Sequence, residues 1–444
     1  MRLLSTHLLL SLCAVFLFSI PLNAQGGPDL ELDTTFYVIP ENAQAPTALF
    51  NPQYFAVNVL NTGDEAANDV IVNCQITNLT TGEVIYSVEK NYGELLPGES
   101  IENDVLNEEP FNLPLTNFFV ERDYRGTYIV TTTSNDINPQ NDTIHFNFSS
   151  SYESLAKESG RTGGVRLQGS NYYIGTCFYI PEPYTFEVRD VEFMIDNASE
   201  VSQGQGAVTI LLYETLGDQN QDGVIDTLEY DYTPIYFNEY LFDGSENQTL
   251  VRSPIHIEAE GPYDRLTLPG GKYYLIVLEY VSEDEEDTIV ISESDEYDYH
   301  ANSVISNQMD LPQYAHVIYS DSLGGDRPNF VINGLGTNIT PLIRLKPFVP
   351  VGNTQSNSLP PNYQITIAPN PADEYFTLVF DFPEQAATQM ALFNQEGRLV
   401  KTYPSQKVYR ETISENCQNL PNGIYTLQVA TEKGNTSRSI VVQH

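Results

Sequence analysis

The chain has 444 residues, of which 60 are Asp or Glu and 20 are Lys or Arg, so its formal net charge at pH 7 is −40. This charge repels nucleic acid and anionic membranes and argues against both as partners. The length suits two to four domains with hydrophobic cores. Cys74, Cys177 and Cys417 are too few and too far apart for a disulfide framework or a Cys-based zinc site. We expect them to be buried free thiols.

The first 24 residues have the pattern of a secretory signal peptide. Arg2 supplies a positive charge, an apolar run of about a dozen residues follows, and the sequence PLNA precedes Gln25. A membrane span needs roughly 20 apolar residues, and Pro21 ends this run earlier. No later segment is long and apolar enough to span a bilayer. We therefore expect residues 1–24 to be cleaved, and the exported mature chain to have no transmembrane segment.

Residues 25–150 predict a first β-sandwich, because apolar and polar residues alternate with the period of a strand. The apolar face includes Phe55, Val57, Val59, Ile144, Phe146 and Phe148. The segments "FAVNVLNTGDEAANDVIVNCQITN", "GELLPGES" and "GTYIVTTTSNDINPQNDT" resemble CARDB-like, immunoglobulin-type modules of bacterial surface proteins. This resemblance implies an immunoglobulin-like sandwich of about seven strands.

Residues 151–346 predict a second, jelly-roll-like β-sandwich, because about ten short strands fit into this length. Residues 151–159, "SYESLAKES", are the one segment with a helical pattern. In "TFEVRDVEFMID" the apolar parity changes at Arg189-Asp190, which predicts a β-bulge or a strand that crosses between sheets. Residues 272–281, "KYYLIVLEYV", are apolar at nearly every position and predict a central strand covered on both faces.

Residues 218–229, "DQNQDGVIDTLE", have the ligand spacing of a hand-type calcium loop. Gly223 occupies the position of the sharp turn, and Ile225 the position of the apolar anchor. The predicted ligands are Asp218, Asn220, Asp222, Val224 through its carbonyl, Asp226 through a water, and Glu229. The flanking segments predict strands, so a sensor with two reorienting helices is not expected. We predict a structural Ca²⁺ ion that orders a long hairpin connection; the alternative is a solvated acidic turn.

The last part of the chain predicts a linker, residues 347–362, and a small immunoglobulin-like sandwich, residues 363–444. Phe376, Leu378, Phe380 and Phe382 alternate toward the predicted core. The motifs "IAPNPADEYFTLVFDF", "MALFNQEGRLVKTY", "LPNGIYTLQVATEKG" and "SRSIVVQ" resemble the type A C-terminal sorting domain of type IX secretion cargo in the Bacteroidota. The resemblance implies that residues 363–444 bind the type IX secretion machinery. It also implies export across the outer membrane, usually removal of this domain, and release or attachment to the cell surface.

The remaining candidates for chemistry are weak. The sequence holds no H-E-x-x-H and no G-x-S-x-G motif, and His145, His256, His300 and His316 form no cluster. His300 follows "SDEYDY", which leaves a second cation site open as an alternative. The tyrosine-rich segments 171–175 and 230–240 leave open a carbohydrate-binding groove, and the alternative is that these rings fill the core.

These observations predict a secreted or surface-displayed, non-enzymatic adhesion or ligand-binding protein. Its partner would be an extracellular glycan or protein. A hydrolase acting on glycan or peptide, with a site assembled from residues distant in sequence, remains an alternative, as does a purely structural surface spacer.

Overall fold

The computed structural model describes residues 26–444 except 114–120, 152–153, 168–170, 183–184, 203–205, 257–265, 282–288, 310–312, 322–327, 348–358, 395–398 and 432–433. The predicted signal peptide and most of the predicted linker lie outside the described residues. Nearly all regular structure in the described part is β-strand, arranged in six sheets, which confirms the predicted all-β class. No helix among the described residues is long and apolar enough to cross a bilayer.

The first sandwich packs a three-stranded sheet against a five-stranded sheet. The first sheet has the order β1 (Leu30–Tyr37), β3 (Val57–Asn61) and β6 (Ser100–Ile101). The second has the order β2 (Gln44–Ala45), β8 (Thr143–Ser150), β7 (Arg122–Thr131), β4 (Ala67–Asn78) and β5 (Val84–Leu95). The six apolar residues predicted to face inward are all at most 8% exposed, so strand parity was predicted correctly here.

The middle sandwich is built around a seven-stranded sheet. Its order is β13 (Val224–Ile225), β20 (Phe330–Ile332), β19 (Val317–Ser320), β10 (Asn171–Ile180), β17 (Lys272–Val281), β12 (Ala207–Thr215) and β14 (Tyr236–Leu241). A four-stranded sheet contains β15 (Val251–Pro254), β11 (Thr185–Phe193), β16 (Leu266–Pro269) and β22 (Ile343–Pro347). A short sheet contains β21 (Thr340–Pro341), β18 (Ile291–Ser294) and β9 (Gly163–Val165).

Strand β17 is central and covered on both faces, as its continuous apolar sequence predicts. It pairs with β10 on one side and β12 on the other. Ile276 and Leu278 belong to the core shared with the four-stranded sheet, whereas Leu275 and Val277 belong to a second cluster on the opposite face. The predicted bulge is also present, because the register of β11 against β22 shifts between Val188 and Asp190.

The predicted helix at residues 151–159 is wrong for the part that the structure describes. Residues 154–159 form no helix, and Leu155 and Ala156 instead make bridges to Leu345 and Gln44. Both residues are fully buried between neighbouring strands, and this tertiary pairing overrides local propensity. The helices in the described part are the 3-10 helix η1 (Thr47–Leu49), α1 (Ala198–Val201) and α2 (His300–Gln308), none of which was predicted.

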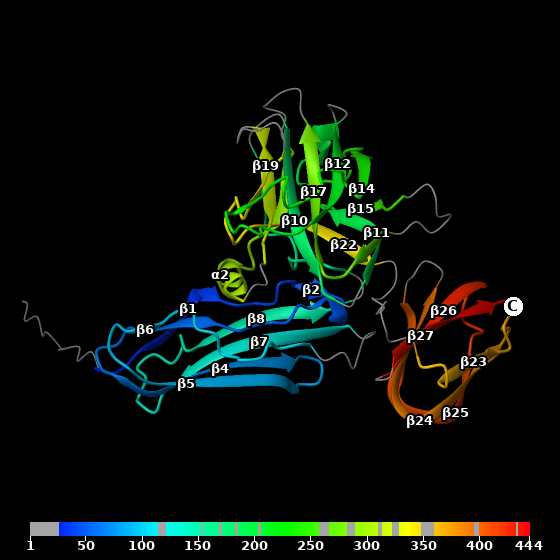
Figure 1. The fold of residues 1–444 in the computed structure, drawn as a ribbon, viewed down its shortest axis with the longest axis horizontal. Coiled ribbons are helices and arrows are strands. Elements are labelled where there is room, and N and C mark those ends of the chain that lie inside the picture. Colours follow the sequence, from blue (N-terminus) through cyan, green and yellow to red (C-terminus); the bar gives the residue numbers. More distant parts are fainter. Residues whose placement is uncertain are drawn as a thin grey trace, which may run out of the picture.

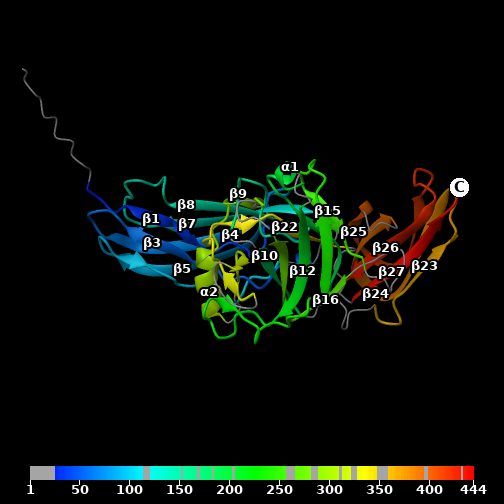
Figure 2. The ribbon, with the colours of Figure 1, turned by 90° about the horizontal axis from the view of Figure 1, so that it is seen from above.

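The first and middle sandwiches share their cores. The middle sandwich packs along one long side of the first, with α2 above β1 (Figure 1). Figure 2 shows the two sandwiches and the C-terminal domain from above. Tyr297, Tyr299 and Ala315 contribute to the first core, whereas Ala45 and Leu49 contribute to the middle one. This exchange of buried residues makes the two sandwiches one continuous body.

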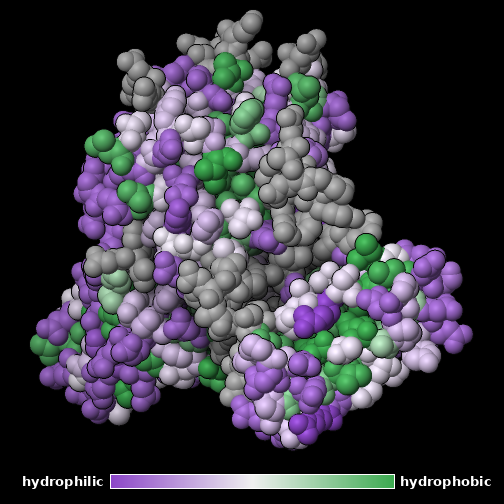
Figure 3. All heavy atoms as spheres, turned by 45° about the vertical axis from the view of Figure 1, so that its right-hand side comes forward, coloured by the Kyte–Doolittle hydropathy of each residue, from purple (hydrophilic) through white to green (hydrophobic). Residues whose placement is uncertain are grey.

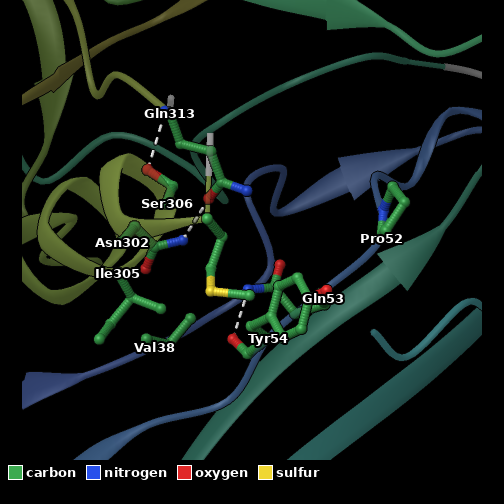
Figure 4. A pocket seen from close by; sticks show the side chains of 9 residues that line it. Val38, Pro52, Gln53, Tyr54, Asn302, Ile305, Ser306 and Gln313 are labelled. Carbon is green, nitrogen blue, oxygen red and sulfur yellow. Dashed lines mark hydrogen bonds between the residues drawn. The ribbon is translucent and has the colours of Figure 1, made fainter. Parts of the chain in front are cut away.

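Helix α2 closes the contact between the two sandwiches through a pair of amide hydrogen bonds. Asn302 Nδ2 donates to the carbonyl of Ile39 at 2.7 Å, and the Ile39 N–H donates back to Asn302 Oδ1 at 3.1 Å. A small cavity between Tyr54 and Met309 lies beside these bonds (Figure 4). Asn302 also donates to Gln313, so the polar groups at this cavity already satisfy one another.

The C-terminal domain is a separate sandwich with its own core. Its strands are β23 (Gln364–Ala368), β24 (Tyr375–Asn394), β25 (Leu399–Asn416), β26 (Gly423–Thr431) and β27 (Gly434–Val442). The register of β24 against β25 shifts between Asp381 and Ala386, so the first part of β24 pairs with β23 and the second part with β26. The four aromatic and aliphatic residues predicted to face inward on β24 are at most 2% exposed, as expected.

Candidate functional site

The predicted calcium loop crosses the outer face of the seven-stranded sheet. It leaves β12 after Thr215, and its short strand β13 pairs with β20, where Ile225 lies opposite Phe330. The chain then returns to a bridge between Tyr230 and Thr215. Ile225 is fully buried, as expected for the apolar anchor, and it joins Tyr230 and Phe330 in the second core cluster. The loop therefore covers this face of the sheet.

The start of the loop wraps around the carboxylate of Asp218. Asp218 Oδ2 accepts a hydrogen bond from the Gly223 N–H at 2.9 Å, and its Oδ1 accepts one from the Asp222 N–H at 3.1 Å. Gly223 has φ of +84°, the left-handed conformation predicted for the sharp turn. Asn220 Oδ1 accepts the Asp222 N–H at 2.9 Å, and Asp222 Oδ1 accepts the Val224 N–H at 2.9 Å.

Glu229, the last predicted ligand, folds back over the start of the loop. Its Oε1 accepts the N–H groups of Gln219 at 2.6 Å and Asn220 at 3.2 Å, and its Oε2 accepts the Asp226 N–H at 3.1 Å. Glu229 is 5% exposed and Asp218 is 9% exposed. The structure thus brings the two ends of the twelve-residue pattern together.

The loop concentrates four carboxylates in twelve residues. Within the described part of the chain, no Lys or Arg forms an ion pair with Asp218, Asp222, Asp226 or Glu229. Their donors are all oxygens, which suit Ca²⁺ better than softer metals. Among the described residues no three Asp, Glu, His or Cys side chains are grouped closely enough to hold a metal ion. The carboxylates instead accept the backbone N–H groups named above, so Ca²⁺ binding stays a prediction.

The chain in and around the loop exposes large apolar side chains. We define the apolar edge as six residues that are 42–86% exposed: Leu216, Leu228, Tyr232, Ile235, Phe237 and Leu241. Strand β14, which carries two of them, is the outer strand of the seven-stranded sheet. Phe237 and Leu241 have the same parity on β14 and are 69% and 65% exposed. Exposed apolar side chains that lie on one face, as these two do, often mark a binding site.

Most of the tyrosines considered for a carbohydrate groove are core residues. Tyr172 and Tyr173 are 1% and 8% exposed and belong to the two cores of the middle sandwich. Tyr230 and Tyr236 are also buried, and Tyr240 is partly buried against the same core as Tyr172. Tyr232 alone among these six is open to solvent, at 46%. Most of these rings therefore fill the sheet faces, and both tyrosines of segment 171–175 are buried.

The histidines in the described part are dispersed, as their sequence positions indicate. His145 is exposed on β8. His300 begins α2 and contacts the ring of Phe36 edge-on at 5.6 Å, with no cluster of metal ligands around it among the described residues. His316 is fully buried, and burial lowers its pKa from 6.5 to about 4. Its Nε2 accepts the N–H of Leu335 at 2.9 Å, which identifies it as a neutral core residue.

The tail of the chain matches a known family. Residues 366–443 match the family described as the secretion system C-terminal sorting domain, over the same motifs that suggested it. This match supports the predicted type IX sorting domain. A domain of this kind implies contact with the type IX secretion machinery and a secreted or surface-attached protein. The resemblance of residues 25–150 to CARDB-like modules stays a prediction.

Three of the solved structures that match the chain are only distantly similar to it. The clostridial cysteine protease Cwp84 after propeptide cleavage is 10% identical with a TM-score of 0.26, over 64% of this chain and 70% of that one. The BSP domain of a biofilm associated protein is 9% identical with a TM-score of 0.16, over 94% and 81%. Dimeric latent PorU from Porphyromonas gingivalis is 12% identical with a TM-score of 0.16, over 94% and 34%. No curated protein sequence matches the chain, and we infer no function from these structures.

Proposed function

We propose that the chain is a non-enzymatic binding protein, exported by type IX secretion, whose fused first and middle sandwiches act outside the cell. The match of residues 366–443 to the sorting domain is the single observation that supports export. Residues 1–24 would direct the chain across the inner membrane as a cleaved signal peptide. An extracellular glycan or protein would then bind at the apolar edge, and Ca²⁺ would hold the adjoining loop.

The proposal of Ca²⁺ rests on local geometry and charge together. Gly223 has the required φ, Ile225 is anchored in the core, and the Asp218 carboxylate accepts the Gly223 N–H. Asp218, Asp222 and Glu229 would supply carboxylate oxygens, Asn220 its amide oxygen, Val224 its carbonyl, and Asp226 a water-bridged contact. Extracellular modules of this type bind Ca²⁺ with a Kd of roughly 0.1–1 mM. The ion would stabilise the segment that covers one face of the seven-stranded sheet.

The proposal of a binding surface rests on the exposed side chains of the edge strand. Phe237 and Leu241 present large apolar groups beside the exposed Glu239, a mixture of apolar contact and charge that is typical of a specific interface. Hydrophobic residues also reach the surface elsewhere, most clearly on the C-terminal domain (Figure 3). That domain is usually removed after export, which would leave the apolar edge on the delivered protein.

Two measurements on the full chain test this function. Arrays of extracellular glycans and proteins, probed in calcium and in chelator, should show a ligand that wild type retains and that the double variant Phe237→Ser/Leu241→Ser loses at least tenfold. Val84→Ser is the matched control, because Val84 is 49% exposed on β5 of the first sandwich, and it should bind normally. Metal-dependent hydrolysis of an arrayed polymer, or equal binding by all three proteins, would contradict the proposal.

The calcium part is tested separately by titration calorimetry. Wild type should bind one Ca²⁺ at the loop, and the double variant Asp218→Ala/Glu229→Ala should not. Unchanged calcium binding in the double variant would exclude the loop while leaving the binding surface untouched.

A further inference from the structure

Lys157 is a fully buried lysine where the two sandwiches meet. It belongs to residues 151–159, whose sequence pattern predicts a helix that the described residues do not form. The neighbouring Ala156 forms a two-hydrogen-bond bridge with Gln44, at 3.0 and 2.8 Å. This antiparallel contact brings residues 41–45 of the first sandwich alongside the segment that joins the two sandwiches. A lysine side chain with no access to water needs a specific partner.

The partner of Lys157 is an equally buried carboxylate. Lys157 Nζ lies 3.0 Å from Glu41 Oε1, and the two side chains are 0% and 2% exposed. The rings of Phe178 and Tyr299 lie 5.8 and 5.6 Å from the same nitrogen. The amine therefore lies in a largely aromatic, water-excluding site beside a carboxylate that can accept its proton.

The second oxygen of the same carboxylate accepts a hydrogen bond from a primary amide. Asn51 Nδ2 donates a hydrogen bond to Glu41 Oε2, and Asn51 Oδ1 is buried with no partner in the described structure. Glu41 thus bridges an amine and an amide that are 106 residues apart in sequence. Glu41 and Asn51 also line a cavity walled by Phe50, Phe111 and Phe148. The arrangement places a side-chain amide on the same carboxylate as the lysine amine.

We propose that Lys157 and Asn51 form an intramolecular isopeptide bond, with Glu41 as the catalytic residue. Glu41 takes a proton from the Lys157 ammonium, and the freed amine attacks Asn51 Cγ. The new Cγ–Nζ bond forms, Glu41 returns a proton to Asn51 Nδ2, the Cγ–Nδ2 bond breaks, and ammonia leaves. Ammonia and the remaining amine proton depart together as ammonium, so atoms and charge balance without any oxidant or cofactor.

Three features of the site favour this reaction over its competitors. The shared carboxylate holds both reacting groups in place, so the attack is intramolecular, and burial excludes the water that would hydrolyse the amide. Pro52 follows Asn51 and has no backbone N–H, so the backbone cannot attack the Asn51 side chain in place of Lys157. The bond would tie the first sandwich covalently to the segment that leads into the middle one.

Peptide mapping of the denatured full chain tests the bond directly. Cleavage after glutamate should release residues 42–65 and 154–158 as one joined species, lighter than the sum of the two peptides by one ammonia, about 17 Da. Glu41→Gln, Lys157→Met and Asn51→Ala should each give separate peptides. Asn42→Ala is the matched control, because Asn42 is a neighbouring buried amide that lines the same cavity, and it should keep the joined species.

The wild-type map decides the question even where a variant fails to fold. Separate, unmodified 42–65 and 154–158 peptides from folded wild type would overturn the proposal and leave a plain buried ion pair. A joined species that persists in Asn51→Ala but vanishes in Asn42→Ala would also overturn it, because the acceptor would then be Asn42. The outcome does not depend on calcium or on the proposed binding surface.

Discussion

Replacing Glu229 separates the structural role of the loop from its proposed calcium role. Its carboxylate is 5% exposed and accepts three backbone N–H groups. Hydrogen bonds to a charged group contribute about 1.5–3 kcal/mol each. Two of the three share Oε1, so we count one bond for each oxygen, and two bonds at the lower value give about 3 kcal/mol. We expect Glu229→Ala to lose about 3 kcal/mol in chelator. Glu229→Gln, which keeps an acceptor oxygen, should lose about 1 kcal/mol.

Calcium should then distinguish wild type from both variants. At free calcium of about ten times the Kd, binding to the folded state stabilises by ~1.4 kcal/mol, which raises the midpoint of thermal unfolding by about 3 °C in a body of this size. Scanning calorimetry of the full chain in chelator and in calcium measures the shift. Glu239→Gln is the matched control on exposed β14 and should keep it. A full calcium shift in Glu229→Gln, or no shift in wild type, would show that Glu229 does not bind calcium in this loop.

Two further predictions concern the middle core. Because burial lowers the pKa of His316 from 6.5 to about 4, the unfolded state binds the extra proton between these values. Stability should fall by about 3 kcal/mol as the pH drops through this window, and urea unfolding should show a shallower fall for His316→Gln; equal pH slopes would contradict this. In Gly175→Ala the new Cβ would lie 2.1 Å from the Ile276 carbonyl oxygen, so we expect a loss of about 3 kcal/mol. Gly160→Ala, which meets nothing within 4 Å, should be near neutral by the same urea assay; similar losses in both would show that the clash is not the cause.

The period-2 alternation of apolar and polar residues predicted most of the fold, because successive side chains of a strand point to opposite faces of the sheet. It identified the buried parity of β24 and the central position of β17. It failed at Leu155 and Ala156, where local helix pattern and buried pairing to distant strands disagreed. Helix α2 was missed because its sequence, HANSVISNQ, has only a weak apolar stripe and packs through Ala301 and Ile305 against the first sandwich.

The candidate site shows the same division between local and long-range information. The spacing of residues 218–229 predicted the positive φ of Gly223 and the burial of Ile225, since both follow from the local turn. It did not predict that the loop covers one face of a seven-stranded sheet. Nor did any pattern indicate the contact of Lys157 with Glu41, because 116 residues separate them and only the docking of the two sandwiches brings them together.

The most direct test of the whole account is the location and extent of the protein made by cells with and without residues 363–444. Fractionation combined with peptide mapping should find the wild-type protein outside the cell. Its delivered form should contain both sandwiches and end within or near residues 347–362, while the truncated chain stays inside. Extracellular delivery of the truncated chain, or full-length protein with its tail confined to the cell interior, would contradict the account.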